Sequence, residues 1–152
     1  MMRNSLRLTA RTGLASTILT GVVAWSLTAR GDTPELFEIR SPEATRTQID
    51  ITVREVERRP RSSVIRIEVR KAGSSVGHSF FILCSIRKLA IARGAGRYIA
   101  TLEDYGSRDD TLVAFLRSEQ ERPADADPDF ASSTRTKIAD LELFAPICDV
   151  MP

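Results

Sequence analysis

The sequence predicts an α+β fold in which a small mixed or antiparallel sheet of about five strands carries one main helix on one face. Isoleucine and valine alternate with charged residues over 63–70, which is the pattern of a half-buried strand. An apolar segment with helical spacing follows over 75–93, and residues 97–103 alternate again. This unit of strand, helix and strand organises the rest of the chain.

The predicted helix begins where Ser74 or Ser75 can cap it and ends at Gly94, because glycine readily takes the left-handed conformation of a helix stop. At about 100° per residue one side of the helix is apolar, and we expect that side to pack on the sheet. It consists of Val76, Phe80, Leu83, Ile86 and Ala90, whereas Ser74, His78, Ser85 and Lys88 lie opposite.

A hairpin on each side of this unit completes a predicted ββαβββ order. Residues 48–56 alternate as a first strand and reach the second strand through a charged turn that contains Pro60. Residues 111–117 are expected to pair with residues 97–103. Their continuous apolar run predicts a strand that is covered on both faces.

The remaining segments are expected to be less regular. Residues 118–134 are rich in acidic residues, serine and proline, which predicts a mobile acidic loop. Residues 136–144 regain strand character, with a bulge or a late start where the alternation breaks. Residues 146–152 are expected to form an extended tail.

The chain divides into an export signal over 1–29, a polar lead-in over 30–46 and a single domain over 47–152. Three arginines precede an uncharged run of 18 residues, which is the layout of a secretory signal peptide. Cleavage is expected after Ala24 or after Ala29. The alternative is an uncleaved membrane anchor, which the serines and threonines within the run disfavour. No cysteine lies near either cleavage point, so we expect no lipid-modified N-terminus. Because the leader has the layout of a signal peptide, we expect a periplasmic or secreted protein.

Charge is distributed unevenly along the chain. The full chain has 22 basic and 20 acidic residues, but three arginines lie in the leader, so cleavage after Ala29 leaves 19 basic and 20 acidic residues. Residues 46–97 contain 12 basic and 4 acidic residues, whereas residues 98–152 contain 5 basic and 12 acidic residues. This asymmetry suits a polyanion-binding face, or two halves that neutralise each other where they pack.

The two cysteines, Cys84 and Cys148, both lie in the exported part of the chain. An even number of cysteines in an oxidising compartment favours a disulfide. The alternative is that Cys84 is a small buried apolar residue and Cys148 is a free thiol.

The segment Gly73-Ser74-Ser75-Val76-Gly77 matches the G-x-S-x-G pattern of serine hydrolases, between a predicted strand and a predicted helix. A hydrolase base would have to come from a histidine later in the chain, but His78 is the only histidine. A turn and a helix cap are therefore the expected role of this segment, and Ser75 as a nucleophile is the disfavoured alternative.

Two sets of residues are candidates for binding anions. A helix start with nearby cations can hold one anionic group, and the candidates for this role are Ser74, Ser75, His78, Arg70 and Lys71. A broader basic face could instead bind a polyanion such as an anionic envelope polymer. It would use Arg54, Arg66, Arg70, Lys71, Arg87 and Lys88.

We expect no metal, cofactor or nucleic acid. One histidine without clustered thiols is too few ligands for zinc. Asp125, Asp127 and Asp129 have the spacing that starts a calcium loop, but Phe130 and Thr136 replace the glycine and glutamate that such a loop needs. Few aromatic residues accompany the basic residues on the strands, which disfavours nucleic-acid binding.

Three consecutive segments carry a resemblance to known proteins: SSVIRIEVRKAG, SIRKLAIARG and RYIATLED. They resemble small envelope and periplasmic proteins and lipoproteins of proteobacteria that have no assigned function, over Ser63 to Asp104 only. The resemblance implies a small exported domain and no catalytic residues. We therefore expect a binding or structural role in the cell envelope, with an envelope protein or an anionic polymer as partner and without catalysis.

Overall fold

The structure is a computed structural model that describes residues 35–42 and 48–150. The predicted leader and both of its cleavage points lie outside the described residues. The regular elements are β1 (Glu38–Arg40), β2 (Asp50–Arg58), β3 (Ser62–Lys71), α1 (Ser75–Ala92), β4 (Tyr98–Glu103), β5 (Asp110–Leu116), α2 (Pro123–Ala126), η2 (Pro128–Phe130), β6 (Lys137–Asp140), η3 (Leu141–Phe144) and α3 (Ala145–Cys148).

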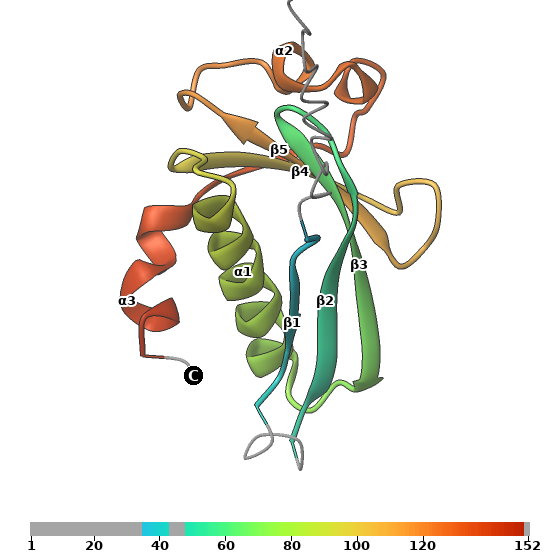
Figure 1. Ribbon diagram of the computed structural model, residues 1–152, viewed down its shortest axis with the longest axis vertical. Coiled ribbons are helices and arrows are strands. Elements are labelled where there is room, and N and C mark those ends of the chain that lie inside the picture. Colours follow the sequence, from blue (N-terminus) through green and yellow to red (C-terminus); the bar gives the residue numbers. More distant parts are fainter. Residues whose placement is uncertain (1–34, 43–47, 151–152) are drawn as a thin grey trace, which may run out of the picture. The chain divides into compact units, whose positions relative to one another are not determined.

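The strands form one antiparallel sheet in the order β1-β2-β3-β5-β4-β6 (Figure 1). This sheet and its main helix confirm the predicted α+β fold and both hairpins. β3 and β4 are each antiparallel to β5, which lies between them, so they run parallel to one another and α1 connects them. The sequence prediction missed β1, a three-residue edge strand inside the polar lead-in.

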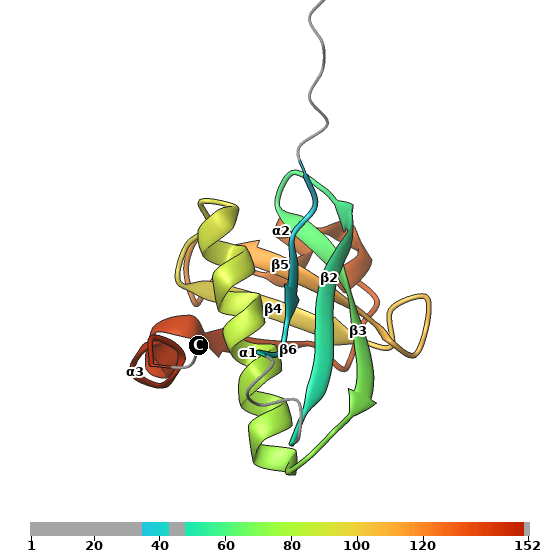
Figure 2. The same cartoon turned by 60° about the horizontal axis from the view of Figure 1, so that its bottom comes forward.

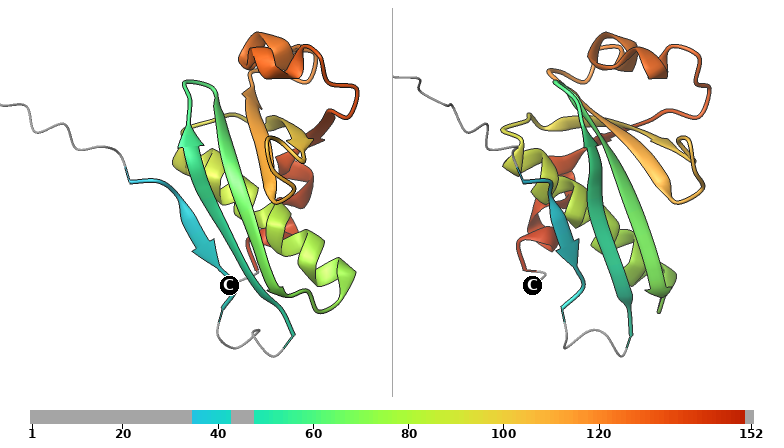
Figure 3. Two further views of the ribbon diagram at one scale, coloured as in Figure 1. Left: turned by 90° about the vertical axis from the view of Figure 1, so that its right-hand side faces the viewer. Right: turned by 45° about the vertical axis from the view of Figure 1, so that its right-hand side comes forward.

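Apolar side chains cover the sheet on both faces. On one face α1 packs on Ile51, Ile65 and Ile99 of three strands, and it crosses β4 in Figure 2. On the other face Phe130 of η2 packs on Leu112 of β5. Figure 3 shows α1 and the α2–η2 segment on opposite sides of the sheet. Every residue of β5 is buried, as the continuous apolar run predicted.

α1 has the predicted ends. The Ser74 hydroxyl accepts a hydrogen bond of 3.1 Å from the Gly77 N–H, and Gly94 follows the last turn with a φ of +60°. Gly73, just before the cap, has a φ of +62°, and a Cβ added there would lie 2.1 Å from the carbonyl oxygen of Gln48. The turn into α1 therefore needs glycine for its conformation and for its space.

The predicted packing face of α1 is correct at Ile86 and Ala90, which are buried in the core, and wrong at its start. Val76 is 62% exposed, whereas Ser85, expected on the solvent side, is buried and donates a hydrogen bond of 2.7 Å to the carbonyl oxygen of Phe81. The buried residues are Phe81, Cys84, Ser85, Ile86, Leu89 and Ala90. The helix is apolar around most of its circumference, so its periodicity does not single out one face.

By length and composition α1 would also be long enough to cross a membrane, a test that core helices of soluble proteins pass as well. In the described part of the chain it packs on the sheet and against the C-terminal segment. Its apolar character is therefore accounted for within the domain.

Residues 118–134 are mostly turns, and they contain two short helices, α2 and η2, that the prediction of an acidic loop did not include. Cations of the β2–β3 turn hold this segment in place. Arg61 forms a bidentate ion pair of 2.8 and 2.9 Å with Glu121. Arg59 donates to Asp127 at 3.0 Å and to Asp129 at 2.9 Å. The sequence could not show that basic and acidic residues about 60 positions apart would meet.

The three aspartates of the candidate calcium loop have protein partners. Asp127 is buried and bonds Arg59 and the Ser62 hydroxyl, while Asp129 bonds Arg59 and the Tyr105 hydroxyl. Asp125 pairs with a neighbouring arginine in its own turn. Asp127 and Asp129 therefore share the cation Arg59, whereas Asp125 pairs separately.

The C-terminal end also differs from the prediction. The strand expected over 136–144 ends at Asp140, and the chain continues as η3 and α3 instead of an extended tail. The Asp140 side chain accepts from the Glu142 N–H at 3.0 Å, and its ion pair with Arg97 lowers its pKa. This cap turns the backbone out of the sheet after four residues.

A buried carboxylate, Glu55 of β2, stands at the end of the core nearest the β2–β3 turn. It accepts two hydrogen bonds of 3.1 Å from the Arg58 Nε, one of 2.7 Å from the Ser63 hydroxyl and one of 3.1 Å from the Phe37 N–H. Burial alone would raise the pKa of Glu55, but hydrogen bonds from Arg58, a serine hydroxyl and a backbone N–H outweigh it and lower the pKa to about 2.

Arg93, directly after α1, joins the helix end to this carboxylate. Its Nη1 donates to Glu55 at 3.0 Å and to the Ser63 hydroxyl at 2.7 Å, and its guanidinium lies 5.4 Å from the centre of the Phe115 ring. Glu55 and Arg93 therefore fix where α1 ends over the sheet.

Candidate binding groove

α1 does not cover the whole of the sheet face on which it packs. The uncovered part of the sheet and α1 together form a groove of about 560 Å³. The floor comes from the second half of β3 and from β4, β5 and β6, and one wall comes from the first three turns of α1. We call this space the groove. Its volume lies within the range of small-molecule sites in proteins.

The interior of the groove is mostly apolar. Ile67, Ile99 and Ala139 contribute from three strands, while Ile82 and Ile86 face them from α1. Because side chains alternate along a strand, these strand residues share the face that α1 covers further along the sheet. The threonine hydroxyls of β4 and β5 add polar atoms to the same floor.

Charges of both signs surround the opening. Lys137 of β6 pairs with Glu103 of β4 at 2.7 Å, and Arg108 and Asp109 of the β4–β5 turn also line the groove. The rim therefore carries little net charge. Such a site favours an apolar group with a weakly charged or zwitterionic polar end over a polyanion.

Of the five residues predicted to bind one anion, only His78 lines the groove. Ser74 caps α1 and accepts from Gly77. Arg70 and Lys71 are exposed at the end of β3 and do not line it. Anion binding at the start of α1 stays a prediction, and only its histidine lies in the groove.

Ser75 is the first residue of α1 and is exposed. Within residues 35–42 and 48–150, no hydrogen bond joins its hydroxyl to His78 or to a carboxylate. The same residues contain no group of three or more His, Cys, Asp or Glu side chains arranged to hold a metal ion.

Three of the basic residues considered for polyanion binding form ion pairs with acidic residues. Arg66 forms a bidentate pair of 2.7 and 2.9 Å with Asp110, and Arg87 pairs with Asp149 at 2.8 Å. Arg54 pairs with a glutamate on the neighbouring strand. The pairs of Arg66 and Arg87 join the basic half of the chain to the acidic half, and they favour the alternative in which the two halves neutralise each other.

A second apolar hollow, of about 350 Å³, adjoins the groove on a neighbouring face of α1. Val76, Phe80 and Phe144 line the hollow, and Ser79 and Leu83 line both it and the groove. The two spaces therefore share one helical wall.

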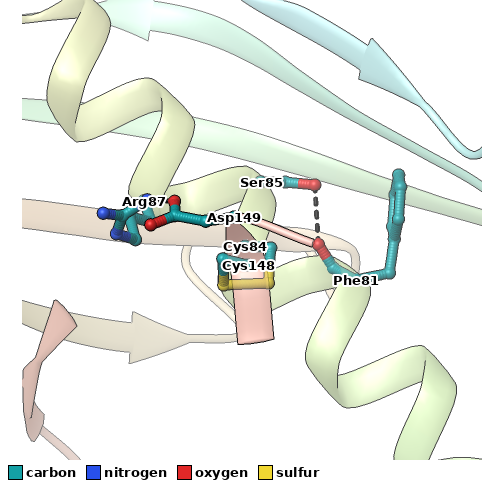
Figure 4. The surroundings of a disulfide bond; sticks show 6 residues. All are labelled: Phe81, Cys84, Ser85, Arg87, Cys148 and Asp149. Atoms are coloured by element: carbon teal, nitrogen blue, oxygen red, sulfur yellow. Dashed lines mark hydrogen bonds and ion pairs between the residues drawn. A yellow bond between two sulfur atoms is a disulfide. The ribbon is translucent and has the colours of Figure 1, made fainter. Parts of the chain in front are cut away.

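The predicted disulfide between Cys84 and Cys148 is present, and it joins α1 to α3 (Figure 4). Both cysteines are buried, and the Arg87–Asp149 ion pair lies next to the bond. A disulfide of this kind is typical of proteins outside the reducing cytoplasm.

None of the protein-family models, curated proteins or solved structures with which the chain was compared matches it. The resemblance to proteobacterial envelope proteins therefore stays a prediction.

The sequence analysis missed the groove. Its only local signal was the pair Thr101 and Thr111, polar residues at positions where the strand alternation places side chains under the helix. The sequence did not show that α1 would leave this end of the sheet uncovered.

Proposed function

We propose that this protein is an exported, periplasmic domain with a non-catalytic binding role in the cell envelope, and that its ligand is apolar or amphipathic. The groove carries this proposal. Ile67, Ile82 and Ile99 would hold the apolar part of the ligand, and the paired charges at the rim would contact its polar end.

Export is supported by two independent features. The arginines and apolar run at the N-terminus have the layout of a signal peptide. The disulfide is the form that paired cysteines take in an oxidising compartment. Mass spectrometry of the protein from a periplasmic fraction should give the mass of a chain that has been cleaved after Ala24 or after Ala29. An intact chain recovered from the cytoplasm with two free thiols would contradict export.

Binding is tested with a neutral apolar fluorophore, N-phenyl-1-naphthylamine. We expect it to bind, and Ile82→Gln to weaken binding by about tenfold, because this change places an amide in the apolar wall. Ile91→Gln is the matched control, since Ile91 lies on the same helix, is 61% exposed and does not line the groove. Circular dichroism should show both variants folded. Equal effects of the two substitutions, or no binding by the unsubstituted protein, would refute the proposal.

A further inference from the structure

The last described residues of the chain form a C-terminal strap, residues 141–150, that lies along α1 (Figure 3). Its beginning is tied to the sheet, because Leu141 is buried and its N–H donates to the Arg97 carbonyl oxygen at 2.9 Å. Beyond Leu141, Cys148 is the one buried residue of the strap, whereas Leu143 is 70% and Val150 is 80% exposed. Packing therefore holds the strap at its start and contributes little at its end.

Two interactions tie the far end of the strap to α1: the disulfide and the ion pair between Arg87 and Asp149 (Figure 4). The Asp149 side chain is 63% exposed, so water and salt screen this ion pair and it contributes little. The disulfide is the main restraint on this end.

The strap covers one stripe of α1. Phe80, Leu83, Cys84 and Arg87 follow the spacing of residues that share a helix face, and Phe144 of the strap lines the second hollow together with Phe80 and Leu83. Because Leu83 also lines the groove, the strap borders and narrows access to apolar surface that is continuous with the groove wall.

We propose that the Cys84–Cys148 disulfide is a redox-sensitive clasp: its reduction frees the C-terminal strap and adds the stripe of α1 beneath it to the binding surface of the groove. This inference rests on the proposed binding function of the groove. The sheet, the hydrogen bonds of buried Glu55 with Arg58 and Arg93, and the cap of α1 lie outside the strap. They keep the rest of the domain folded.

The reductant is a dithiol. One of its thiolates attacks a sulfur of the disulfide and forms a mixed disulfide, and its second thiol then displaces the protein sulfur. The reductant leaves as a cyclic disulfide, and Cys84 and Cys148 become thiols, so two electrons and two protons pass to the protein. Cys84 and Cys148 are buried, whereas Asp149 and Val150 beside Cys148 are exposed, so the reductant reaches the sulfur when this end of the strap opens.

Hydrogen–deuterium exchange of the full chain, with and without dithiothreitol, tests the release of the strap. We expect amides of residues 142–150 to exchange at least about tenfold faster after reduction, while amides of β2, β3 and β5 keep their protection. The double variant Cys84→Ala/Cys148→Ala should exchange like the reduced protein without any reagent. Arg87→Gln, which removes only the ion pair, should leave strap exchange within about threefold of the unsubstituted protein.

The link to the groove is tested by titrating N-phenyl-1-naphthylamine into both redox forms. We expect the reduced protein to bind the fluorophore at least about threefold more tightly, because more apolar surface is accessible. Unchanged strap exchange, loss of protection in the sheet on reduction, or equal affinity of the two forms would each overturn the proposal. If neither form binds the fluorophore, the proposed binding function fails, and the exchange measurement still decides whether the disulfide clasps the strap.

Discussion

Replacing Glu55 with glutamine tests whether the buried ion cluster fixes α1 over the sheet. The substitution keeps the shape of the side chain and removes its charge. Glu55 is fully buried, and a folded pKa of about 2 against an ordinary value of 4.5 corresponds to about 3 kcal/mol of stability at neutral pH. This figure already includes the cost of burial. Breaking a buried ion pair by removing one partner typically costs about 3–5 kcal/mol.

The pH dependence of this contribution has a definite sign. The folded pKa of Glu55 is lower than its unfolded value, so its stabilising contribution is fully present above about pH 4.5 and is lost as the pH falls towards 2. We therefore expect Glu55→Gln to lower the free energy of unfolding by about 3 kcal/mol at pH 7 and by less than about 1 kcal/mol near pH 2.

The assay is urea denaturation followed by far-ultraviolet circular dichroism at several pH values, with the disulfide intact. Glu57→Gln is the matched control, because this residue lies two positions along the same strand and its side chain is 53% exposed. Its effect should stay below about 0.5 kcal/mol. A loss of less than about 1 kcal/mol for Glu55→Gln at pH 7, or the same loss at pH 7 and at pH 2, would refute the reasoning.

Two further substitutions, each with a matched control, test how the turns are held. Gly73→Ala should cost at least about 2 kcal/mol in the same denaturation assay, because the added methyl meets backbone at a positive φ. Gly106→Ala, at a φ of +70° with nothing within 4 Å, should cost about 1 kcal/mol, and equal losses would contradict the steric argument. Arg61→Ala should speed limited proteolysis of residues 118–134 by about fivefold, because it removes a bidentate ion pair to this segment. The control is Arg122→Ala, because the Arg122 side chain is 80% exposed and pairs within its own turn. Protease should cleave this variant at the same rate as the unsubstituted protein.

Local patterns were sufficient for the central unit of the fold. Alternation over 63–70 and 97–103 and the cap residues around α1 depend only on neighbours in the chain, so they can be read from sequence. The same holds for β5, whose apolar run required cover on both faces. The predicted packing face of α1 was correct only in part, because two different surfaces, the sheet and the C-terminal strap, pack against the helix.

The candidate site was less accessible to sequence reasoning. Of the residues chosen as anion ligands, His78 alone lies in the groove, and the groove itself depends on which part of the sheet α1 leaves uncovered. The acidic segment over 118–134 looked like a solvated loop because its partners, Arg59 and Arg61, lie in a distant turn. Long-range pairs of this kind follow from topology and leave no local pattern.

By itself the sequence determined the α+β class, the order of the central elements, the ends of α1 and the two cysteines that could pair. These follow from backbone preferences and from the repeat of side chains along a helix or strand, which act over a few residues. Only the tertiary structure decided which charges neutralise each other, which side of α1 is buried and where the sheet stays uncovered. Those outcomes depend on how segments far apart in the chain pack in three dimensions, where burial and pairing change the free energy of each group.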